Sequence, residues 1–395
     1  MATTDVFIVG GARTPMTEYV GALKDVSAIE LGAIASRGAL QKTGAKPEWI
    51  DHAIFGNVMQ TSADAIYGAR HIALKACVPV EVPALTVNRL CGSGIQAAIT
   101  GAQYLQLGEA DIVLTGGVES MSQAPHVIRG LRSGLKLGQG ALEDSLYEGL
   151  RDSMCDMFMA QTAEKCAAQY SITRQAQDEY AIRSQRLADE AWRVGRFAEE
   201  VVPVEIKTRR SGTTMVERDD HMRPDTTLEG LAKLAAAFSK EGTVTAGNAS
   251  GIVDGGAAVI LASESGITAK GLKPIAKLTA WATVGVDPSI MGMGPAPAIR
   301  KVLDRAKLSF GDIDLFEINE AFAAQYLAVE KELGLDRSKV NVNGGAIALG
   351  HPLGATGARL LLTLTLELRR RGAKRGIAAA CIGGGQGIAA LVETL

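Results

Sequence analysis

The sequence predicts an α/β protein made of two similar halves, and three observations lead to this prediction. Short apolar runs alternate with segments of helical periodicity along most of the 395 residues, which is typical of sheets covered by helices. The same succession of strands, turns and helices occurs before residue 118 and again after residue 300. A stretch richer in charge and methionine, roughly 119–246, matches neither copy. We therefore expect two halves that pack pseudo-symmetrically around a shared site, with a domain inserted between them.

The repeat is defined by three landmarks that occur in the same order in both halves. A helix end leads to a short strand, a second strand leads to a glycine-rich turn, and a helix then leads to a strand followed by glycines. In the first half these landmarks occupy 38–60, 85–94 and 95–117. In the second half they occupy 301–322, 340–357 and 358–385. Three matched landmarks in one order indicate a duplication.

The repeat also predicts the domain boundaries. We expect an N-terminal half at 1–118 together with 247–271, an inserted domain at 119–246, and a C-terminal half at 272–395. Within the insert, the apolar spacing predicts amphipathic helices at 178–196 and 226–238.

Composition excludes several classes of function. Lysine and arginine total 41 against 43 acidic residues, so no strong field attracts nucleic acid or an anionic membrane surface. No apolar run approaches the roughly 20 residues that span a bilayer, and the N-terminus lacks the features of a secretory signal. The five cysteines are scattered and odd in number, which favours free thiols in a reducing compartment and no metal site. We expect a cytoplasmic protein, or one of the mitochondrial matrix in a eukaryote.

Cys91 is the first candidate for chemistry. It lies in Asn88-Arg89-Leu90-Cys91-Gly92-Ser93-Gly94, between a strand and a predicted helix. The positive end of a helix favours a thiolate, and the neighbouring glycines let a ligand approach the sulfur. The alternative is a small buried cysteine that packs in a tight turn.

His351 occupies the equivalent turn of the second half, in Gly350-His351-Pro352-Leu353-Gly354. An imidazole exchanges protons near neutral pH and could activate Cys91, although a lone histidine is more often structural. The repeat would bring the two helix starts to one crevice, which favours the catalytic interpretation.

Two further segments end strands of the second half. Cys381 is followed by Ile382-Gly383-Gly384-Gly385, whose backbone N–H groups could bind an oxyanion, although buried cysteines often end strands. Asn319 begins Asn319-Glu320-Ala321-Phe322 and could hold a water or a carbonyl, or simply cap the following helix.

Together these segments resemble the thiolase family over essentially the whole chain. Its four signature blocks resemble Cys91–Gly94, Asn319–Phe322, Gly350–Pro352 and Cys381–Gly385, in family order and spacing, and 242–251 looks like a fifth. The resemblance implies a duplicated thiolase-like fold, in which two pseudo-symmetric mixed-sheet halves are layered α-β-α-β-α with an inserted loop domain.

The resemblance also implies a reaction and its residues. A thiolase cleaves 3-ketoacyl-CoA with coenzyme A, or runs the reverse Claisen condensation, through an acyl-cysteine. Cys91 would be the nucleophile, His351 its base and Cys381 the acid/base at the substrate α-carbon. One oxyanion would bind to His351 and a water held by Asn319, and the other to the N–H groups of Cys91 and Gly383. This division is chemically sensible because one thiol cannot hold the acyl group and move the α-proton at once.

Coenzyme A would be bound as a substrate, with no permanent cofactor and no metal. By resemblance its contacts are Leu150, Met159, Arg223, Phe238, Ala246, Ser250 and Phe322. Apolar walls suit a pantetheine arm and an arginine suits the nucleotide, although Met159 and Phe238 could equally be core residues. The insert would carry most of these contacts and also oligomer contacts, in a dimer or tetramer.

Three alternatives remain open at this point. Short-chain biosynthetic thiolases carry histidine where this chain has Phe158, before Met159, which argues against strict acetoacetyl-CoA specificity. The segments 287–292 and 342–359 look most like 3-ketoacyl-CoA thiolases of fatty acid degradation, so we expect a degradative or broad-range enzyme. A ketoacyl synthase would generally carry histidine in place of Cys381, and a non-catalytic acyl-CoA carrier would need no second thiol.

Overall fold

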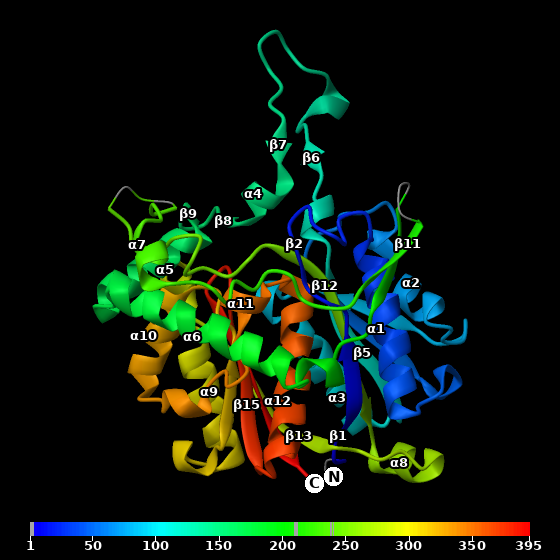
Figure 1. The fold of residues 1–395 in the computed structure, drawn as a ribbon. Coiled ribbons are helices and arrows are strands. Elements are labelled where there is room, and N and C mark those ends of the chain that lie inside the picture. Colours follow the sequence, from blue (N-terminus) through cyan, green and yellow to red (C-terminus); the bar gives the residue numbers. More distant parts are fainter. Residues whose placement is uncertain (1–3, 209–211, 238, 240) are drawn as a thin grey trace.

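The computed structural model describes residues 4–208, 212–237, 239 and 241–395, and its two halves form matching sets of strands (Figure 1). In spatial order the first set is β1 (Phe7–Arg13), β12 (Val253–Ala262), β5 (Ile112–Glu119), β3 (His52–Asn57) and β4 (Ala84–Val87). The second set is β13 (Ala276–Gly285), β16 (Gln386–Thr394), β15 (Arg375–Ile382) and β14 (Leu315–Ile318). An isolated parallel bridge from Phe316 to Val340 takes the position of β4.

Strand directions match as well as strand order. β3 runs parallel to β5 and to β4, and β14 runs parallel to β15, whereas the other neighbours within each set are antiparallel. The two sets are joined where Phe7 pairs with Lys277 and Ile8 with Ala276, and the short β2 (Thr17–Glu18) pairs with β12. The predicted duplication and the mixed sheets are therefore confirmed.

Helices form three layers around the two sets of strands. α1 (Ala28–Thr43) and α2 (Gly68–Lys75) pack on the outer face of the first set, and α9 (Pro295–Ala306) packs on the outer face of the second, beside α10 (Ala323–Leu333). Between the sets lie α3 (Ser93–Leu107) and α12 (Leu353–Arg371), which contact each other and both sheets. Residues 353–368 of α12 are all buried, as expected for a helix enclosed on every side.

Two glycines decide how closely the central helices approach each other. A Cβ at Gly94 would lie 2.3 Å from the backbone N of Ala358, and a Cβ at Gly357 would lie 2.3 Å from the backbone N of Ile95. Only glycine fits at such a distance, since real Cβ atoms do not approach backbone atoms this closely. The backbones of the two first turns therefore touch, and the residues just before them, Cys91 and His351, are carried to one place.

The remaining helices and strands are short or belong to the insert. The insert contains β6 (His126–Val127), β7 (Glu143–Asp144), α4 (Ser145–Gly149), β8 (Arg151–Asp152), β9 (Met157–Phe158), α5 (Met159–Tyr170), α6 (Arg174–Arg193), β10 (Val204–Thr208), β11 (Gly212–Val216) and α7 (Leu228–Ala232). α8 (Glu264–Lys270) and α11 (Ala346–Leu349) lie outside it. Short 3₁₀ segments lie at Pro47–Trp49, Ala65–Tyr67, Leu90–Gly92, Met121–Gln123, Leu131–Ser133, Phe197–Glu199, Pro288–Met293, Phe310–Asp312 and Arg337–Lys339.

The insert covers one end of the two sheets, and β6 and β7 form an arm that projects from the body (Figure 1). Among the described residues, 120–246 adds no strand to the ten-stranded sheet. The helix predicted at 178–196 is found as α6. Of the helix predicted at 226–238, the structure forms only the short α7, which ends at Ala232; farther along, the Ala237 N–H binds the Val244 carbonyl and takes no part in a helix. The division of the chain into three domains stays our proposal.

A buried ion-pair cluster ties the insert to the body. Arg13, at the end of β1, is fully buried and lies 2.6 Å from Glu200 and 2.7 Å from Asp219 at its closest nitrogen–oxygen contacts. Asp219 also accepts from the backbone N–H of Met16 at 2.7 Å. Buried charges persist only when they are paired and hydrogen-bonded, so these contacts hold the insert in a fixed position over the sheets.

Candidate active site

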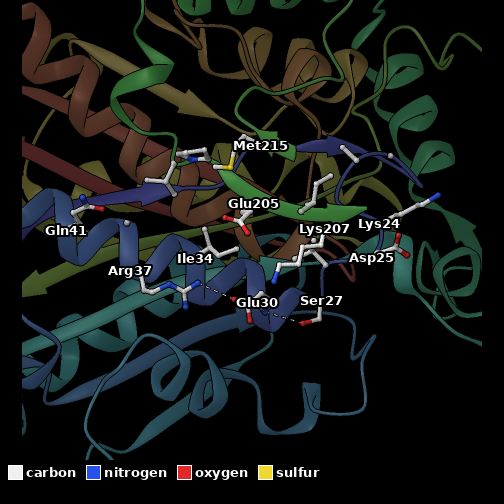
Figure 2. A pocket seen from close by; sticks show the side chains of 17 residues that line it. Lys24, Asp25, Ser27, Glu30, Ile34, Arg37, Gln41, Glu205, Lys207 and Met215 are labelled. Atoms are coloured by element: carbon white, nitrogen blue, oxygen red, sulfur yellow. Dashed lines mark hydrogen bonds and ion pairs between the residues drawn. The ribbon is translucent and has the colours of Figure 1, made fainter. Parts of the chain in front are cut away.

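Several of the predicted site residues line one cavity between the two halves. It has a volume of about 380 Å³ and is lined by Cys91, His351 and Gly383 from the halves, and by Leu150 and Met159 from the insert. A larger groove of about 970 Å³ lies between α1 and β10, where Lys24, Arg37 and Lys207 are among the lining side chains (Figure 2). None of the predicted catalytic residues lines that groove. The smaller cavity is therefore the candidate active site.

Cys91 lies in the 3₁₀ turn Leu90–Gly92 that leads directly into α3. Its thiol is not held as a thiolate, contrary to the expectation from the helix start. Burial raises the pKa of Cys91 to about 11, and hydrogen bonds from the backbone N–H groups of Gly383 and Cys91 lower it without offsetting burial. The helix start does not offset the effect of burial on this partly buried thiol at the cavity wall, so Cys91 needs a base.

His351, whose imidazole is unprotonated, is the candidate for that base. Burial, with a smaller contribution from the Arg359 charge, lowers the pKa of His351 to about 3, so the imidazole is neutral at physiological pH. Its Nδ1 lies 2.6 Å from Thr356 Oγ1, which itself donates to the Pro352 carbonyl at 3.0 Å. Nδ1 must then donate, because the hydroxyl proton is already engaged. This leaves Nε2 with the lone pair that accepts a proton.

Asn319 lies against the reactive nitrogen of His351. Its Nδ2 is 3.3 Å from His351 Nε2, and its residue is fully buried after β14. Among the described residues, Asn319 Oδ1 has no hydrogen-bond partner. A buried amide with a free oxygen beside an imidazole is unlike a helix cap, since the cap of α10 is Phe322 and no Asn319 side-chain bond to that helix is present. The geometry favours the polar role over the capping one.

Cys381 does not form part of the cavity lining, but it packs in a cluster with Met291, Met159 and Phe322, which do. It is fully buried near the end of β15, and burial raises its pKa well above the ordinary value, with a further rise from nearby Cys91. The two sulfurs therefore belong to one electrostatic environment. A neutral thiol close to the nucleophile can give up a proton when a carbanion forms beside it.

The glycines after β15 set the direction of the Gly383 N–H group. Gly384 and Gly385 have φ of 78° and 77°, the left-handed region that other residues rarely adopt. They turn the chain back into β16, which starts at Gln386. This tight reversal aims the N–H of Gly383 at the Cys91 sulfur. The expected pair of backbone donors, Cys91 and Gly383, is thus assembled from both halves.

The residues expected to contact coenzyme A are only partly gathered. Leu150, Met159, Ser250 and Phe322 line the candidate active site. Ser250 and Phe322 also line an adjoining hollow of about 450 Å³, together with Ala246.

Arg223 does not join this set. Arg223 lines neither hollow and forms an ion pair with Glu18, whose side chain lines the adjoining hollow. A nucleotide would therefore have to share or displace this ion pair. Phe238 lies outside the described residues.

Three residues at the site, Glu119, Met121 and Leu353, were not among the site residues predicted from the sequence. Met121 and Leu353 line the cavity beside Cys91. Glu119 ends β5 fully buried, and burial raises its pKa to about 7. Its carboxylate accepts from the backbone N–H groups of Met59 at 2.9 Å and Gly354 at 2.8 Å. One sequence feature could have pointed to Glu119: it is an acidic residue at the end of an apolar strand. A carboxylate buried there needs several hydrogen-bond donors.

Comparison with known proteins agrees with the geometry. Two family models match the chain, the thiolase N-terminal domain over residues 6–265 and the thiolase C-terminal domain over residues 272–394. The chain is 52% identical over 390 residues to the mitochondrial 3-ketoacyl-CoA thiolase of Homo sapiens, covering 98% of both sequences. It is 48% identical over 391 residues to an acetyl-CoA acetyltransferase of Cupriavidus necator, covering 99% of both.

Solved structures give the same result. The crystal structure of human mitochondrial 3-ketoacyl-CoA thiolase in complex with CoA matches with a TM-score of 0.97 and 50% identity, covering 99% of this chain and 98% of that one. The crystal structure of the Bacillus anthracis acetyl-CoA acetyltransferase matches with a TM-score of 0.97 and 47% identity, covering 100% of both chains. The chain therefore belongs to the thiolase family, as its four sequence blocks predicted.

Proposed function

We propose that this thiolase, an acyltransferase, cleaves 3-ketoacyl-CoA with coenzyme A into acetyl-CoA and a shortened acyl-CoA. It would also run the reverse Claisen condensation, including that of two acetyl-CoA molecules to acetoacetyl-CoA. The observation that carries this proposal is the convergence of Cys91, His351 and Gly383 on one cavity, with Cys381 packed against residues of its lining. Two thiols and one neutral imidazole are the groups that this chemistry requires.

In the first half of the reaction, Cys91 attacks the 3-keto carbonyl and forms a carbon–sulfur bond. Its proton passes to His351 Nε2, which is unprotonated because the pKa of His351 is about 3. The bond between the α- and β-carbons then breaks, leaving the acyl group on Cys91. The electron pair of that bond stays on the α-carbon of the departing acetyl-CoA.

Cys381 completes this step by protonating the α-carbon, which yields acetyl-CoA. In the second half, the thiol of free coenzyme A gives its proton to the Cys381 thiolate and attacks the acyl-Cys91 thioester. Cys91 departs as a thiol with the proton that His351 took up, so all three groups return to their starting state. Condensation is the same sequence in reverse, with Cys381 removing the α-proton. Its raised pKa suits it to act as an acid in cleavage and, once ionised, as a strong base in condensation.

Negative charge on two oxygens has to be stabilised during these steps. The backbone N–H groups of Cys91 and Gly383 would bind the oxyanion of the acyl-cysteine step, since both already donate to the Cys91 sulfur. His351 Nε2, once protonated, and a water held by Asn319 would bind the thioester oxygen of the enolate. The free Oδ1 of buried Asn319 supports this assignment.

Coenzyme A would enter through the hollow that adjoins the active site. Met159, Ser250 and Phe322 line the path and would enclose the pantetheine arm, and Leu150 and Ala246 flank its two ends. Arg223 would exchange its ion pair with Glu18 for a phosphate of the nucleotide. A role for Phe238 in the same path rests on the family resemblance alone.

We favour a degradative or broad-range enzyme over one specific for acetoacetyl-CoA. Phe158, which lines the cavity where biosynthetic relatives carry histidine, adds apolar surface and offers no hydrogen bond to a small polar substrate. Relatives that are 46–48% identical and are named acetyl-CoA acetyltransferase keep the biosynthetic assignment as the alternative.

Assembly and location are proposed more coarsely. We propose a homo-oligomer, a dimer or tetramer, in which the insert supplies contacts. We also propose the cytoplasm as its location, or the mitochondrial matrix in a eukaryote. Among the described residues, no helix is long and apolar enough to cross a membrane.

The test is acylation of the folded enzyme by acetyl-CoA, followed by intact-protein mass spectrometry and peptide mapping. We expect one acetyl group on Cys91 and release of free coenzyme A. Cys381→Ala should keep this acetylation yet lose condensation and thiolysis, and His351→Ala should slow acetylation itself. A folded enzyme without an acetyl adduct would refute the proposed function, and turnover by Cys381→Ala would refute the role of that thiol.

A further inference from the structure

A buried carboxylate that the proposed mechanism does not use, that of Glu320, lies at the centre of a cluster of hydrogen bonds. Two donors come from α6 in the insert: the Tyr180 hydroxyl donates to Oε1 at 2.7 Å, and the Ser184 hydroxyl donates to Oε2 at 2.7 Å. Two more come from the C-terminal half, since Asn341 Nδ2 donates to Oε1 at 3.0 Å and the Ile347 backbone N–H donates to Oε2 at 3.1 Å. A carboxylate has about four acceptor positions, so these donors fix the orientation of Glu320.

The same cluster holds the chain on both sides of Asn319. Asn341 Oδ1 accepts from the backbone N–H of Ile318 at 2.8 Å, and Asn341 Nδ2 donates to the Ile318 carbonyl at 2.9 Å. Asn341 has a φ of 47°, in the left-handed region, which asparagine adopts more readily than most residues. Glu320, with its four hydrogen bonds, follows Asn319 directly. The backbone of Asn319 therefore cannot shift without breaking contacts of one neighbour or the other.

The side chain of Asn319 depends on this backbone support. Among the described residues, its one hydrogen-bond contact is that of Nδ2 with His351 Nε2 at 3.3 Å, and its Oδ1 has no partner. The other polar groups of the site are held elsewhere. Thr356 of α12 fixes the His351 ring at 2.6 Å, and the N–H groups of Cys91 and Gly383 belong to other turns. The cluster around Glu320 therefore acts mainly on the position of Asn319.

We propose that Glu320 is a positioning residue for the site that binds the enolate oxygen, and that Tyr180 and Ser184 of the insert hold it in place. This inference rests on the proposed function, in which a water held by Asn319 binds that oxygen. The insert then supports the carbon–carbon bond step as well as coenzyme A binding. Acetylation of Cys91 forms no enolate, so it should not depend on this support.

The test removes one donor to Glu320 and measures the two half-reactions separately. Tyr180→Phe deletes the hydroxyl and keeps the ring, which stacks on Tyr326 with the ring centroids 4.3 Å apart. First-turnover release of coenzyme A from acetyl-CoA in a stopped-flow instrument measures acetylation, and steady-state formation of acetoacetyl-CoA measures condensation. Because a misplacement of about 1 Å can cost about 100-fold, we expect condensation to fall about 10- to 100-fold and acetylation to change less than about twofold. Tyr326→Phe is the matched control: its hydroxyl belongs to the same stack but donates to Glu330 at 2.9 Å, and both rates should stay unchanged.

Two further variants separate positioning from a loss of stability. Ser184→Ala removes the other donor from α6 and should slow condensation while sparing acetylation, as Tyr180→Phe does. Adding Tyr180→Phe to Asn319→Ala should slow condensation no further, because the hydroxyl acts through Asn319. Unchanged condensation in either single variant of α6, an equal fall in acetylation, or further slowing in the double variant would overturn the inference. If acetyl-CoA does not acetylate Cys91 of the unmodified enzyme, the proposed function has failed first.

Discussion

The protonation state of the resting nucleophile gives the sharpest test of the proposed mechanism. Burial raises the pKa of Cys91 to about 11, so the enzyme should hold a neutral thiol and no thiolate–imidazolium pair. Only the thiolate reacts with iodoacetamide. For a pKa of about 11, the thiolate fraction rises roughly 1,000-fold between pH 7 and pH 10, whereas an unperturbed thiol gains only about 30-fold.

The assay follows alkylation of individual cysteines over this pH range by peptide mass spectrometry, with circular dichroism to verify the fold at each pH. Exposed Cys77 reports the behaviour of a thiol in contact with solvent in the same sample. We expect the rate for Cys91 to rise about tenfold per pH unit without a plateau. A rate that levels off below pH 8 would mean that Cys91 is ionised at rest, and the argument that His351 must take its proton during attack would be wrong.

Three further predictions follow from single contacts. Gly94→Ala should lower the free energy of unfolding by at least about 2 kcal/mol in urea titrations, because its Cβ would lie 2.3 Å from the backbone N of Ala358, whereas Gly230→Ala, with 3.4 Å to its nearest neighbour, should change little. Equal effects would contradict this explanation. The pKa of Glu119 is raised to about 7, so the protonated form stabilises the fold below about pH 4.5 and this stability is lost as the pH rises through 7. Relative to Glu119→Gln, the free energy of unfolding of the unmodified enzyme should fall by up to about 3 kcal/mol over this pH window. A difference in unfolding free energy between the two proteins that does not change with pH would be inconsistent with a raised pKa. The pKa of His351 is lowered to about 3, so the base stays unprotonated well below pH 6. The rate of Cys91 acetylation, measured by stopped-flow release of coenzyme A, should therefore show no loss centred near pH 6.5. Such a loss would argue against the lowered pKa of His351.

The amino-acid sequence by itself determined the architecture and the chemistry-bearing groups. The periodicity of apolar residues was sufficient to detect the repeat. The face of a helix or strand on which a side chain lies depends only on local backbone geometry. Leu315–Ile318 is a strand as expected, and the matched strand order of the two halves follows from the repeated landmarks. Cys91, His351 and Gly383 could be selected because each stands at the end of a strand or the start of a helix, where short-range sequence signals are strong.

Only the tertiary structure decided the properties that depend on what surrounds each group. The sequence suggested an ionised Cys91 at a helix start, but burial by segments distant in the chain outweighs that local field. Contacts between distant residues also decide the roles of two other side chains. Arg223 pairs with Glu18, which lies 205 positions away in the sequence, and the buried carboxylate of Glu119 joins β5 to α12. Desolvation, ion pairing and cavity shape are set by contacts between residues far apart in sequence, so no local pattern encodes them.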